Sequence, residues 1–426
     1  MIMGFVNNEN EAETSTNSIN FATENTPLIA NPKKSSQFKT LANIFIAIVG
    51  SGVLGLPYTF KKSGYILGII TLSCVALLTY YCMLLLVSTR RKLESLNGYS
   101  KINSFGDLGF CVCGSFGRFS VDLMIILSQA GFCVSYMIFV SNTIAHVFIP
   151  KIENQSFLGF TPKKWFLWGC LPFQLGLNSI PTLTHLAPLS IFADFVQIGA
   201  MCVVMAKDVL IITYNRPTVQ PFGGFNVLFY CVGVCTYAFE GIGMVLPLET
   251  EAKDKKNFGK TLGVSMGMIS ILYASFGALG YFAFGDDTKD IITTNIGNGI
   301  VSTLVQLGLC INLFFTFPLM MNPVYEVLER RWSQGSYSLL SRWLMVLGVT
   351  LVALLVPNFA DFLSLVGSSV CIALGFVFPS LFHLIVFKDE VGFGRLVLDG
   401  AIVVISIVLG VSGTYSSLME IFAPKT

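Results

Sequence analysis

The sequence predicts an all-α integral membrane protein of about eleven transmembrane helices, and three observations carry this prediction. Only 12% of the 426 residues are charged and 54% are hydrophobic, whereas an average soluble domain has about 25% charged residues. Uncharged stretches long enough to cross a hydrocarbon core of roughly 30 Å recur along the chain, the first clear one covering residues 63–89. Two of the apolar stretches are interrupted by clustered Gly and Pro residues.

Composition also excludes several classes of function. The net charge is +2 and the Lys and Arg residues are scattered, so no basic face for nucleic acid is expected. Most of the eleven cysteines fall in apolar segments, and Cys111 with Cys113 lacks the second pair that a zinc site needs. We expect His146, His185 and His383 to lie near helix ends or in a loop, outside any cluster of carboxylates. The sequence therefore indicates neither an enzyme, a metal site nor a bound cofactor.

The first 37 residues are rich in Asn, Glu, Ser and Thr and poor in large apolar side chains, so we expect a disordered cytosolic tail. An N-terminal apolar stretch is missing, and no cleaved signal peptide is expected. Within the tail, Glu24, Leu28 and Ile29 resemble the acidic dileucine signal that cytosolic adaptors read when they sort membrane proteins to vacuoles or lysosomes.

Apolar runs between charged or Pro- and Gly-rich breaks predict the individual spans. They cover residues 41–62, 65–88, 119–149, 165–181, 186–212, 226–248, 262–284, 299–328, 340–357, 361–386 and 394–418.

The charge distribution predicts the orientation in the membrane. Of the 26 Lys and Arg residues, seventeen fall on the same side as the N-terminal tail, eight on the other side and one, Lys207, inside a span. Because cytosolic loops carry an excess of Lys and Arg, the tail is predicted to be cytosolic and the C-terminus lumenal. The glycosylation sequon at Asn154 agrees, since this orientation puts it in a lumenal loop.

Two spans carry similar interruptions. The first span contains Gly50-Ser51-Gly52 followed by Pro57, and the sixth contains Gly241-Ile242-Gly243 followed by Pro247. Helices unwound in mid-membrane are typical of secondary transporters built from inverted repeats, whereas scattered glycines alone would indicate only close helix packing. We therefore predict two inverted five-helix repeats at 38–212 and 220–387, followed by an extra C-terminal helix within 388–426.

The chemistry of such breaks follows from unpaired backbone groups. Free N–H groups at the start of a half-helix favour a carboxylate, and free carbonyls at the end of the preceding half favour an ammonium group or a cation. A zwitterion satisfies both, and glycine lets a ligand approach the backbone. The predicted substrate-binding residues are Gly50, Ser51, Gly52 and Val53 in the first break and Phe239, Glu240 and Gly241 in the second.

The chain resembles the amino acid/auxin permease family, in particular its proton-assisted and vacuolar transporters. Three runs carry the resemblance, which covers nearly all of 38–418: residues 52–57 (GVLGLP), residues 128–133 (SQAGFC) and residues 239–249 (FEGIGMVLPLE). It implies the LeuT-type fold of five plus five inverted helices with one extra helix, amino acid substrates and, often, proton coupling. The chain departs from the proton-assisted members at Asn43, where those proteins carry a histidine, so their proton mechanism does not transfer to this position.

Further candidates lie inside the spans. Glu240 beside the second break is either a proton-exchanging carboxylate or a structural hydrogen-bond acceptor. Asp194 is either a second proton site or a packing residue. Tyr136 is expected to close over the substrate or to pack, and Thr316 is a candidate oxygen ligand of a cation site beside the first span. Lys207 and Asp208 are interpreted as anchors at a membrane interface.

Together these patterns predict a secondary active transporter of small neutral amino acids in the vacuolar or lysosomal membrane, working by alternating access with protons as the coupling ion. Neutral substrates are favoured because no arginine or second acidic residue is expected in the pocket. Two alternatives stay open, a carrier of auxin or another small organic acid and an amino acid-sensing, receptor-like carrier. A channel is not favoured, because the sequence has neither a ring of charges nor a repeated filter loop.

Overall fold

A computed structural model describes residues 37–97, 102–149, 161–181, 187–214, 217–224, 227–297, 299–332, 336–356, 358–390 and 392–422; for residues 97, 187–192, 194 and 332 it describes the backbone only. The helices are α1 (Gln37–Ile48), η1 (Ser51–Gly55), α2 (Leu56–Ser63), α3 (Tyr65–Asn97), α4 (Phe105–Phe148), α5 (Pro162–Asn178), α6 (Ala187–Tyr214), α7 (Val227–Ala238), α8 (Ile242–Glu251), α9 (Phe258–Phe284), η3 (Gly285–Asp287), η4 (Ile292–Thr294), α10 (Ile300–Trp332), α11 (Leu339–Leu355), α12 (Phe359–Val366), the π-helical η5 (Gly367–Cys371) and η6 (Ala373–Val377), α13 (Phe378–Phe387) and α14 (Phe393–Phe422).

The described part of the chain is all-helical, and the predicted fold class is confirmed. Eight helical segments are long and apolar enough to cross a membrane, and the bent pair of α1 with η1 and α2 makes a ninth. The two remaining predicted spans correspond to α5 and α11, which have 17 residues each and are slightly shorter than a typical membrane-spanning helix. The count of eleven spans stays a prediction, as do the boundaries of the two repeats.

α4 begins fourteen residues before the predicted start of the third span. Ser104 caps its first turn by accepting a hydrogen bond from the amide of Asp107. The helix is then interrupted at Cys113 and Gly114, where Gly114 has a left-handed φ of 63°, a conformation that glycine adopts without strain. Arg118 pairs with Asp107 across this interruption. These charges hid the short first segment from a prediction based on apolar runs.

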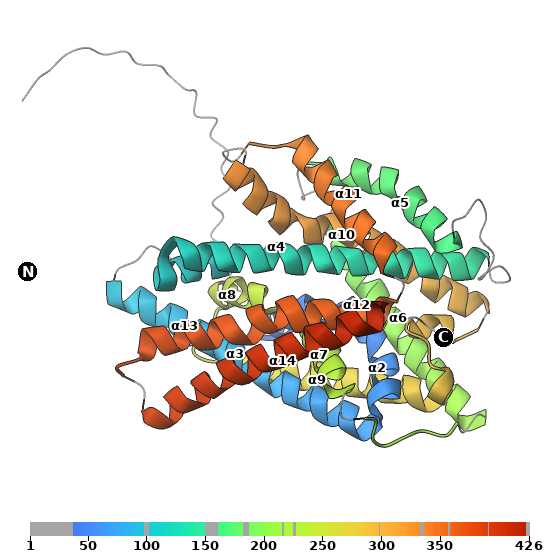
Figure 1. Cartoon of the computed structure of the whole chain (residues 1–426), viewed down its shortest axis with the longest axis horizontal. Coiled ribbons are helices and arrows are strands. Elements are labelled where there is room, and N and C mark those ends of the chain that lie inside the picture. The colour runs from blue at the N-terminus through green and yellow to red at the C-terminus, as the bar shows by residue number, and fades with distance from the viewer. Residues whose placement is uncertain are drawn as a thin grey trace, which may run out of the picture. The chain divides into compact units, whose positions relative to one another are not determined.

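α4 runs through the middle of the bundle (Figure 1). α5, α10 and α11 pack on one side of it, and α12 and α13 contact it from the other. α3 packs against α7, α9 and α13, while α6 lies against α9 and α10. The residues of the first break, 51–57, are buried, and so are residues 230–238 of α7 that lead into the second break.

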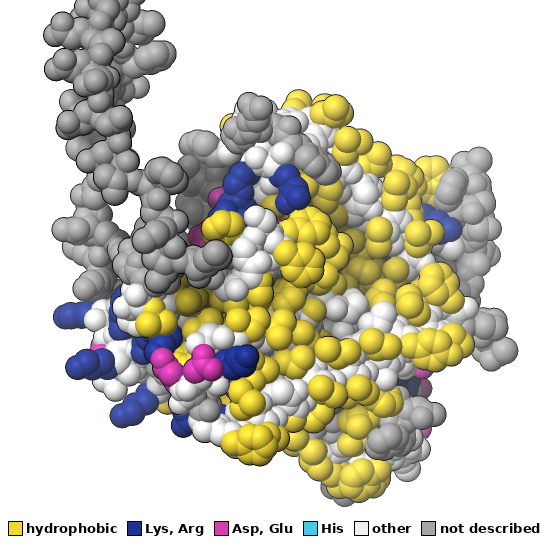
Figure 2. Space-filling view, turned by 60° about the vertical axis from the view of Figure 1, so that its left-hand side comes forward, with side chains coloured by type: hydrophobic (Ala, Val, Ile, Leu, Met, Phe, Trp, Pro, Cys, Tyr) yellow, Lys and Arg dark blue, Asp and Glu magenta, His cyan; other side chains and the backbone are white. Residues whose placement is uncertain are grey.

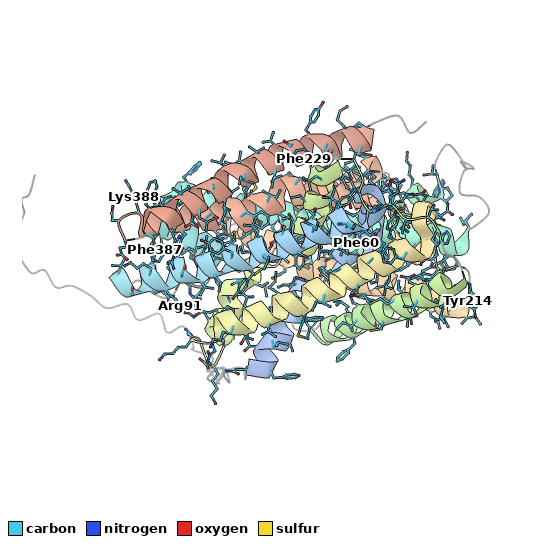
Figure 3. The ribbon with its side chains drawn as sticks, turned by 90° about the horizontal axis from the view of Figure 1, so that it is seen from below. Phe60, Arg91, Tyr214, Phe229, Phe387 and Lys388 are labelled. Carbon is cyan, nitrogen blue, oxygen red and sulfur yellow. The ribbon has the colours of Figure 1, made fainter. Side chains whose placement is uncertain are left out.

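The bundle has two polar ends separated by apolar surface. Figure 3 shows Arg91, Phe387 and Lys388 at one end and Tyr214 at the other. We call the first the Arg91 end; Lys and Arg side chains gather there beside a broad hydrophobic surface (Figure 2). α1 begins at this end, where Gln37 donates a hydrogen bond to Asp254. Hydrogen bonds from Asn257 lower the pKa of the Asp254 carboxyl.

The opposite end is defined by Lys62 at the end of α2, and we call it the Lys62 end. The Lys62 ammonium lies 3.4 Å from Asp361 at the start of α12 and 3.0 Å from Glu420 near the end of α14. Tyr230 of α7 also donates to Asp361, at 3.1 Å. One cation therefore joins elements from four parts of the chain. The sorting signal at Glu24, Leu28 and Ile29 and the sequon at Asn154 lie outside the described residues.

The expectation for Asp208 is wrong. Asp208 is not an interfacial anchor, because its side chain is fully buried in the protein, while the neighbouring Lys207 donates to Ser302 of α10. His383 has one carboxylate partner, since its Nδ1 lies 2.7 Å from Asp399 of α14, which also accepts a hydrogen bond from Tyr81 of α3. Helix phase decides which of these polar side chains face the interior.

Candidate functional site: two interrupted helices

The first break separates α1 from the short helices that follow it. α1 ends at Ile48, Gly50 adopts an extended conformation with φ −128° and ψ −162°, and a tight 3₁₀ turn leads into α2. The two halves of the span are bent by 50°. Pro57 at the start of α2 suits this geometry, because a first-turn proline has no intrahelical amide bond to lose.

The second break separates α7 from α8. α7 ends at Ala238, and Phe239, Glu240 and Gly241 are non-helical before α8 begins at Ile242. Gly241 is extended, with φ −179°. The glycine-rich sequences therefore interrupt both helices, as their Gly-x-Gly patterns predict.

The two breaks lie against each other. A Cβ atom added to Gly52 would lie 2.7 Å from the Cα of Ala238, and one added to Gly241 would lie 2.8 Å from the Cγ1 of Ile48. These two glycines thus allow close contact between the helices themselves. Gly50 differs, because a Cβ atom there would meet no other atom within 4 Å. Of these three glycines, Gly50 alone has the open face that a ligand can approach.

Carbonyl groups released by the first break are bonded by neighbouring helices. Tyr273 of α9 donates to the carbonyl of Ile48 at 3.2 Å, and Gln197 of α6 donates to the carbonyl of Gly50 at 3.4 Å. Asn312 of α10 donates to the side-chain oxygen of Gln197, and Thr316 donates in turn to Asn312. Thr316, the predicted cation ligand, is therefore linked to the break through two amide side chains.

The two helix starts that follow the breaks have no capping side chain at the N-cap position itself. Gly50 and Gly241 are the N-cap residues of η1 and α8. The first amides of a helix have no intrahelical acceptor, and the Glu240 carboxylate accepts a hydrogen bond from one of them, the amide of Ile242. Since Gly241 packs on Ile48, the two helix starts lie near each other in space. Both carry the partial positive charge that favours a carboxylate.

Aromatic and hydroxyl side chains flank the breaks. The hydroxyl of Tyr237, one residue before the end of α7, is 2.6 Å from Ser135 of α4 and within reach of Ser51 in the first break. The ring of Phe132 packs edge-on against Tyr237, with centroids 4.8 Å apart. Tyr136 is buried and close enough to Tyr237 to interact electrostatically. The structure therefore brings Ser51 and Tyr136 together through Tyr237.

The other predicted residues differ in their burial. Phe239 is fully buried against Tyr273, and Val53 is fully buried. Glu240 is partly buried, faces the amide of Ile242 and lies near Cys371 of η5. Asp194 lies on α6, and its side chain is outside the described part of the structure.

Sequence reasoning missed several residues of this region, among them Ser135, Gln197, Tyr237, Tyr273 and Asn312. Gln197 and Asn312 had a detectable signal, because amide side chains are costly inside an apolar span unless they have partners. Ser135 and Tyr273 had none, because Ser and Tyr are common in packed membrane helices.

A helical bundle with two interrupted helices in contact is the architecture of LeuT-type secondary transporters. Mhp1, a nucleobase-cation-symport-1 family transporter, shares this fold. Its inward-facing structure has a TM-score of 0.53 and 12% identity, covering 91% of this chain and 90% of that one. Its closed structure has a TM-score of 0.51 and 13% identity, covering 91% of each chain.

The family model described as transmembrane amino acid transporter protein matches residues 33–420, and the chain belongs to this family of transporters. Amino acid transporter AVT3C of Arabidopsis thaliana is 60% identical over 99% of this chain and 100% of its own length. Amino acid transporter ANT1 of the same plant is 36% identical over 93% and 96%. Vacuolar amino acid transporter 3 of Saccharomyces cerevisiae is 27% identical over 90% of this chain and 57% of its own length. The resemblance found in the sequence is confirmed, and the chain is a transporter and not an enzyme.

Proposed function

We propose that this protein is a secondary active transporter of small neutral amino acids in the vacuolar membrane, working by alternating access. The observation that carries the proposal is the contact between the two interrupted helices, with a glycine N-cap at each helix start and an open face at Gly50. Membership of an amino acid transporter family and relatives named as vacuolar transporters support the substrate and the membrane.

The surroundings of the breaks favour a small, uncharged substrate side chain. Tyr237, Ser135, Phe132 and Tyr273 are neutral, and all four are buried or nearly so. A zwitterion offers a carboxylate to the amides of the helix starts and an ammonium to carbonyl or hydroxyl oxygens. A cationic or anionic substrate side chain would need a buried counter-charge here.

We propose protons as the coupling ion, with Glu240 as the group that carries the proton. It lies beside the second break, and an ionisable side chain inside a membrane protein is a functional candidate. From an acidic lumen, the coupled direction of transport is export to the cytosol. The amide groups of Gln197 and Asn312 lie between Gly50 and Thr316, which favours Thr316 as part of this polar network over a cation-ligand role.

Reconstituted protein tests the proposal directly. Liposomes loaded with radiolabelled alanine should show saturable transport, counterflow with unlabelled alanine, and acceleration by an imposed pH gradient. Flux without saturation or counterflow would contradict a carrier mechanism, and alanine transport that ignores the pH gradient would contradict proton coupling.

The same assay separates the alternative substrates and the receptor. Indole acetate should not compete with alanine; strong competition would instead support an organic acid carrier. A receptor-like protein would bind alanine without transporting it. A transporter does not need the tail for flux, so a variant lacking residues 1–34 should transport alanine as fast as the full chain.

A further inference from the structure

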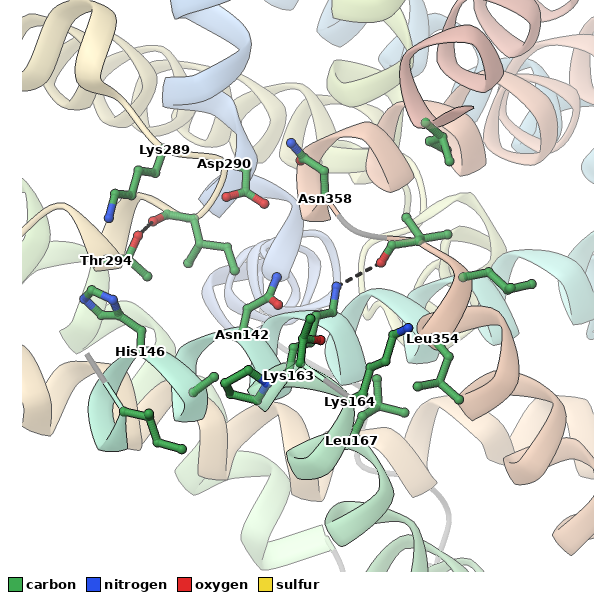
Figure 4. Close-up of a pocket in the computed structure, with 18 residues that line it drawn as sticks. Asn142, His146, Lys163, Lys164, Leu167, Lys289, Asp290, Thr294, Leu354 and Asn358 are labelled. Atoms are coloured by element: carbon green, nitrogen blue, oxygen red, sulfur yellow. Dashed lines mark hydrogen bonds between the residues drawn. The ribbon is translucent and has the colours of Figure 1, made fainter. Parts of the chain in front are cut away.

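A cavity lies at the Lys62 end of the bundle, away from every predicted substrate-binding residue. Its volume is about 870 Å³, and it is bounded by α4, α5, the η4 region and the ends of α11, α12 and α14. Figure 4 shows the side chains of Lys163, Lys289 and His146 around this space. The helix ends that meet here make the cavity an entrance to the bundle at this end.

The cavity is lined by more positive than negative charge. Among the residues that the structure describes, three lysines, Lys163, Lys164 and Lys289, line it together with one carboxylate, Asp290. That carboxylate is already engaged, because it accepts a hydrogen bond from the amide of Phe359 at the start of α12. Lys163 and Lys164 also belong to the first turn of α5, whose unpaired amides add partial positive charge. The lining is therefore electropositive.

One face of α4 connects this cavity with the two breaks. His146 and Asn142 line the cavity, Phe139 lies one turn further in, and Tyr136 lies beside Tyr237 after one more turn. Asn142 and Tyr136 are six residues apart, about 9 Å along a helix. The cavity therefore lies within two turns of α4 from the proposed substrate site.

A layer of buried apolar side chains closes the passage between them. The rings of Phe139 and Phe359 meet with centroids 5.7 Å apart, and both are fully buried. Ile291 lines the cavity, while the next residue, Ile292, is also fully buried and lies near Pro57 and Gly280. The structure therefore shows the passage closed at the Lys62 end.

We propose that this cavity is the outer vestibule of the substrate route and that its lysines form an electrostatic filter. The filter attracts the carboxylate of neutral and acidic amino acids and repels amino acids with a cationic side chain. Charged clefts change local ion concentrations in this way because low-dielectric walls focus the field. This inference rests on the proposed function and adds to it a basis for rejecting cationic substrates before they reach the breaks.

The potential of the cavity can be measured without transport. In an Asn142→Cys variant, the anionic reagent sulfonatoethyl methanethiosulfonate should label Cys faster than its trimethylammonium analogue, by about tenfold at low salt. The preference should shrink in high salt and in a Lys164→Gln/Lys289→Gln background. A Lys253→Gln/Lys256→Gln background, with the same charge change in the loop after α8, should keep it. Mass spectrometry of the peptide separates this Cys from the native ones. Equal labelling by both reagents would overturn the filter.

The effect on specificity is measured by competition. Lysine should inhibit alanine transport from the Lys62 end weakly in the native protein and about tenfold more strongly in Lys164→Gln/Lys289→Gln. A Lys164→Arg/Lys289→Arg variant, which keeps the charge, should behave like the native protein. Unchanged inhibition by lysine in the Gln variant would overturn the filter. Alanine transport by the same protein would still support the proposed function. Absence of alanine transport in the native protein would overturn the function, and the labelling ratio would still report the cavity's charge.

Discussion

At the scale of single residues, the glycines of the first break have different tasks. Gly52 contacts the backbone of Ala238, whereas Gly50 has open space where a side chain would lie. Gly52→Ala should therefore lower stability by about 1–3 kcal/mol, the usual effect of overpacking. Gly50→Ala should leave stability unchanged, because its extended φ suits any residue, and should raise the KM for alanine by narrowing the open face. Thermal unfolding in detergent and transport kinetics test the pair; equal destabilisation by both changes would contradict it.

Glu240 gives a second prediction at this scale. Glu240→Gln keeps the shape of the side chain and removes its ability to exchange a proton. Alanine counterflow at equal pH should continue, while acceleration by a pH gradient should be lost. Gln197→Glu is a useful control, since it adds a carboxylate to the network at Gly50 without restoring one at the second break. Full pH-driven transport in Glu240→Gln would show that the carboxylate is only a structural acceptor.

Much of the site could be predicted at the residue scale, because Gly-x-Gly followed by Pro indicates a helix break without knowledge of tertiary contacts. The different roles of Gly50 and Gly52 could not be predicted, because they depend on which segment packs against each glycine. The same limit applies to Asp208 and His383. Their burial and partners depend on the rotation of α6 and α13, which apolar composition does not fix.

At the scale of elements, α8 is held to α3 by a buried ion pair at the Arg91 end. Arg90 and Glu249 are both almost fully buried and pair with each other, and Arg91 also binds Glu249 at 2.8 Å. Glu249→Gln should destabilise the protein by on the order of 3 kcal/mol, because it leaves the buried Arg90 charge with only Glu94, which is partly exposed and 3.8 Å away. The midpoint of thermal unfolding in detergent measures this loss.

An exposed pair near the same end provides the comparison. Lys92 lies 2.5 Å from Glu390, whose side chain is 55% exposed, and such surface pairs contribute below about 1 kcal/mol. Lys92→Gln should therefore leave the unfolding midpoint nearly unchanged. Equal shifts in Lys92→Gln and Glu249→Gln would contradict the assigned role of burial.

The elements themselves were largely predictable, because each span is long and its apolar run is bounded by charge or proline. The start of α4 was missed for the opposite reason, since Asp107 and Arg118 break the apolar run although the chain is helical around them. The break at Gly50 could be predicted from its glycines. The hydrogen bonds from Tyr273 and Gln197 that stabilise it could not, because these residues are more than a hundred positions away in the chain.

At the scale of the whole molecule, Lys62 links α2 to α12 and α14 while the passage at its end is closed. We expect this end to open by separation of α2 from α12, two of the helices that Lys62 joins. Lys62→Gln should therefore favour the open form and increase labelling of a Ser135→Cys variant by a thiol reagent several-fold. Lys61→Gln is the matched control, because the contacts described for Lys61 are with the carbonyl of Thr288 and the ring of Tyr58 and not with a carboxylate. Labelling that is insensitive to Lys62→Gln would show that the ion pairs do not control opening.

The global fold followed from sequence because the two breaks and the family resemblance point to the same inverted repeat. The closed passage could not be predicted, because nothing in the sequence distinguishes Phe139 and Phe359 from other apolar residues; only the folded bundle places their rings in contact. The basic cavity could not be predicted either, because Lys163 and Lys289 are 126 positions apart in the chain and fall between different pairs of predicted spans.

The π-helical run between α12 and α13 has a consequence for how this end moves. Residues 367–377 contain two segments with wider hydrogen-bonded turns, and Gly367 packs against the backbone of Gly233. Short π-helical turns inside α-helices occur frequently at functional sites. We expect α12, with Phe359 and Asp361, to rotate about this run, whereas the contact between His383 and Asp399 holds α13 to α14. The two halves of this span would then move separately.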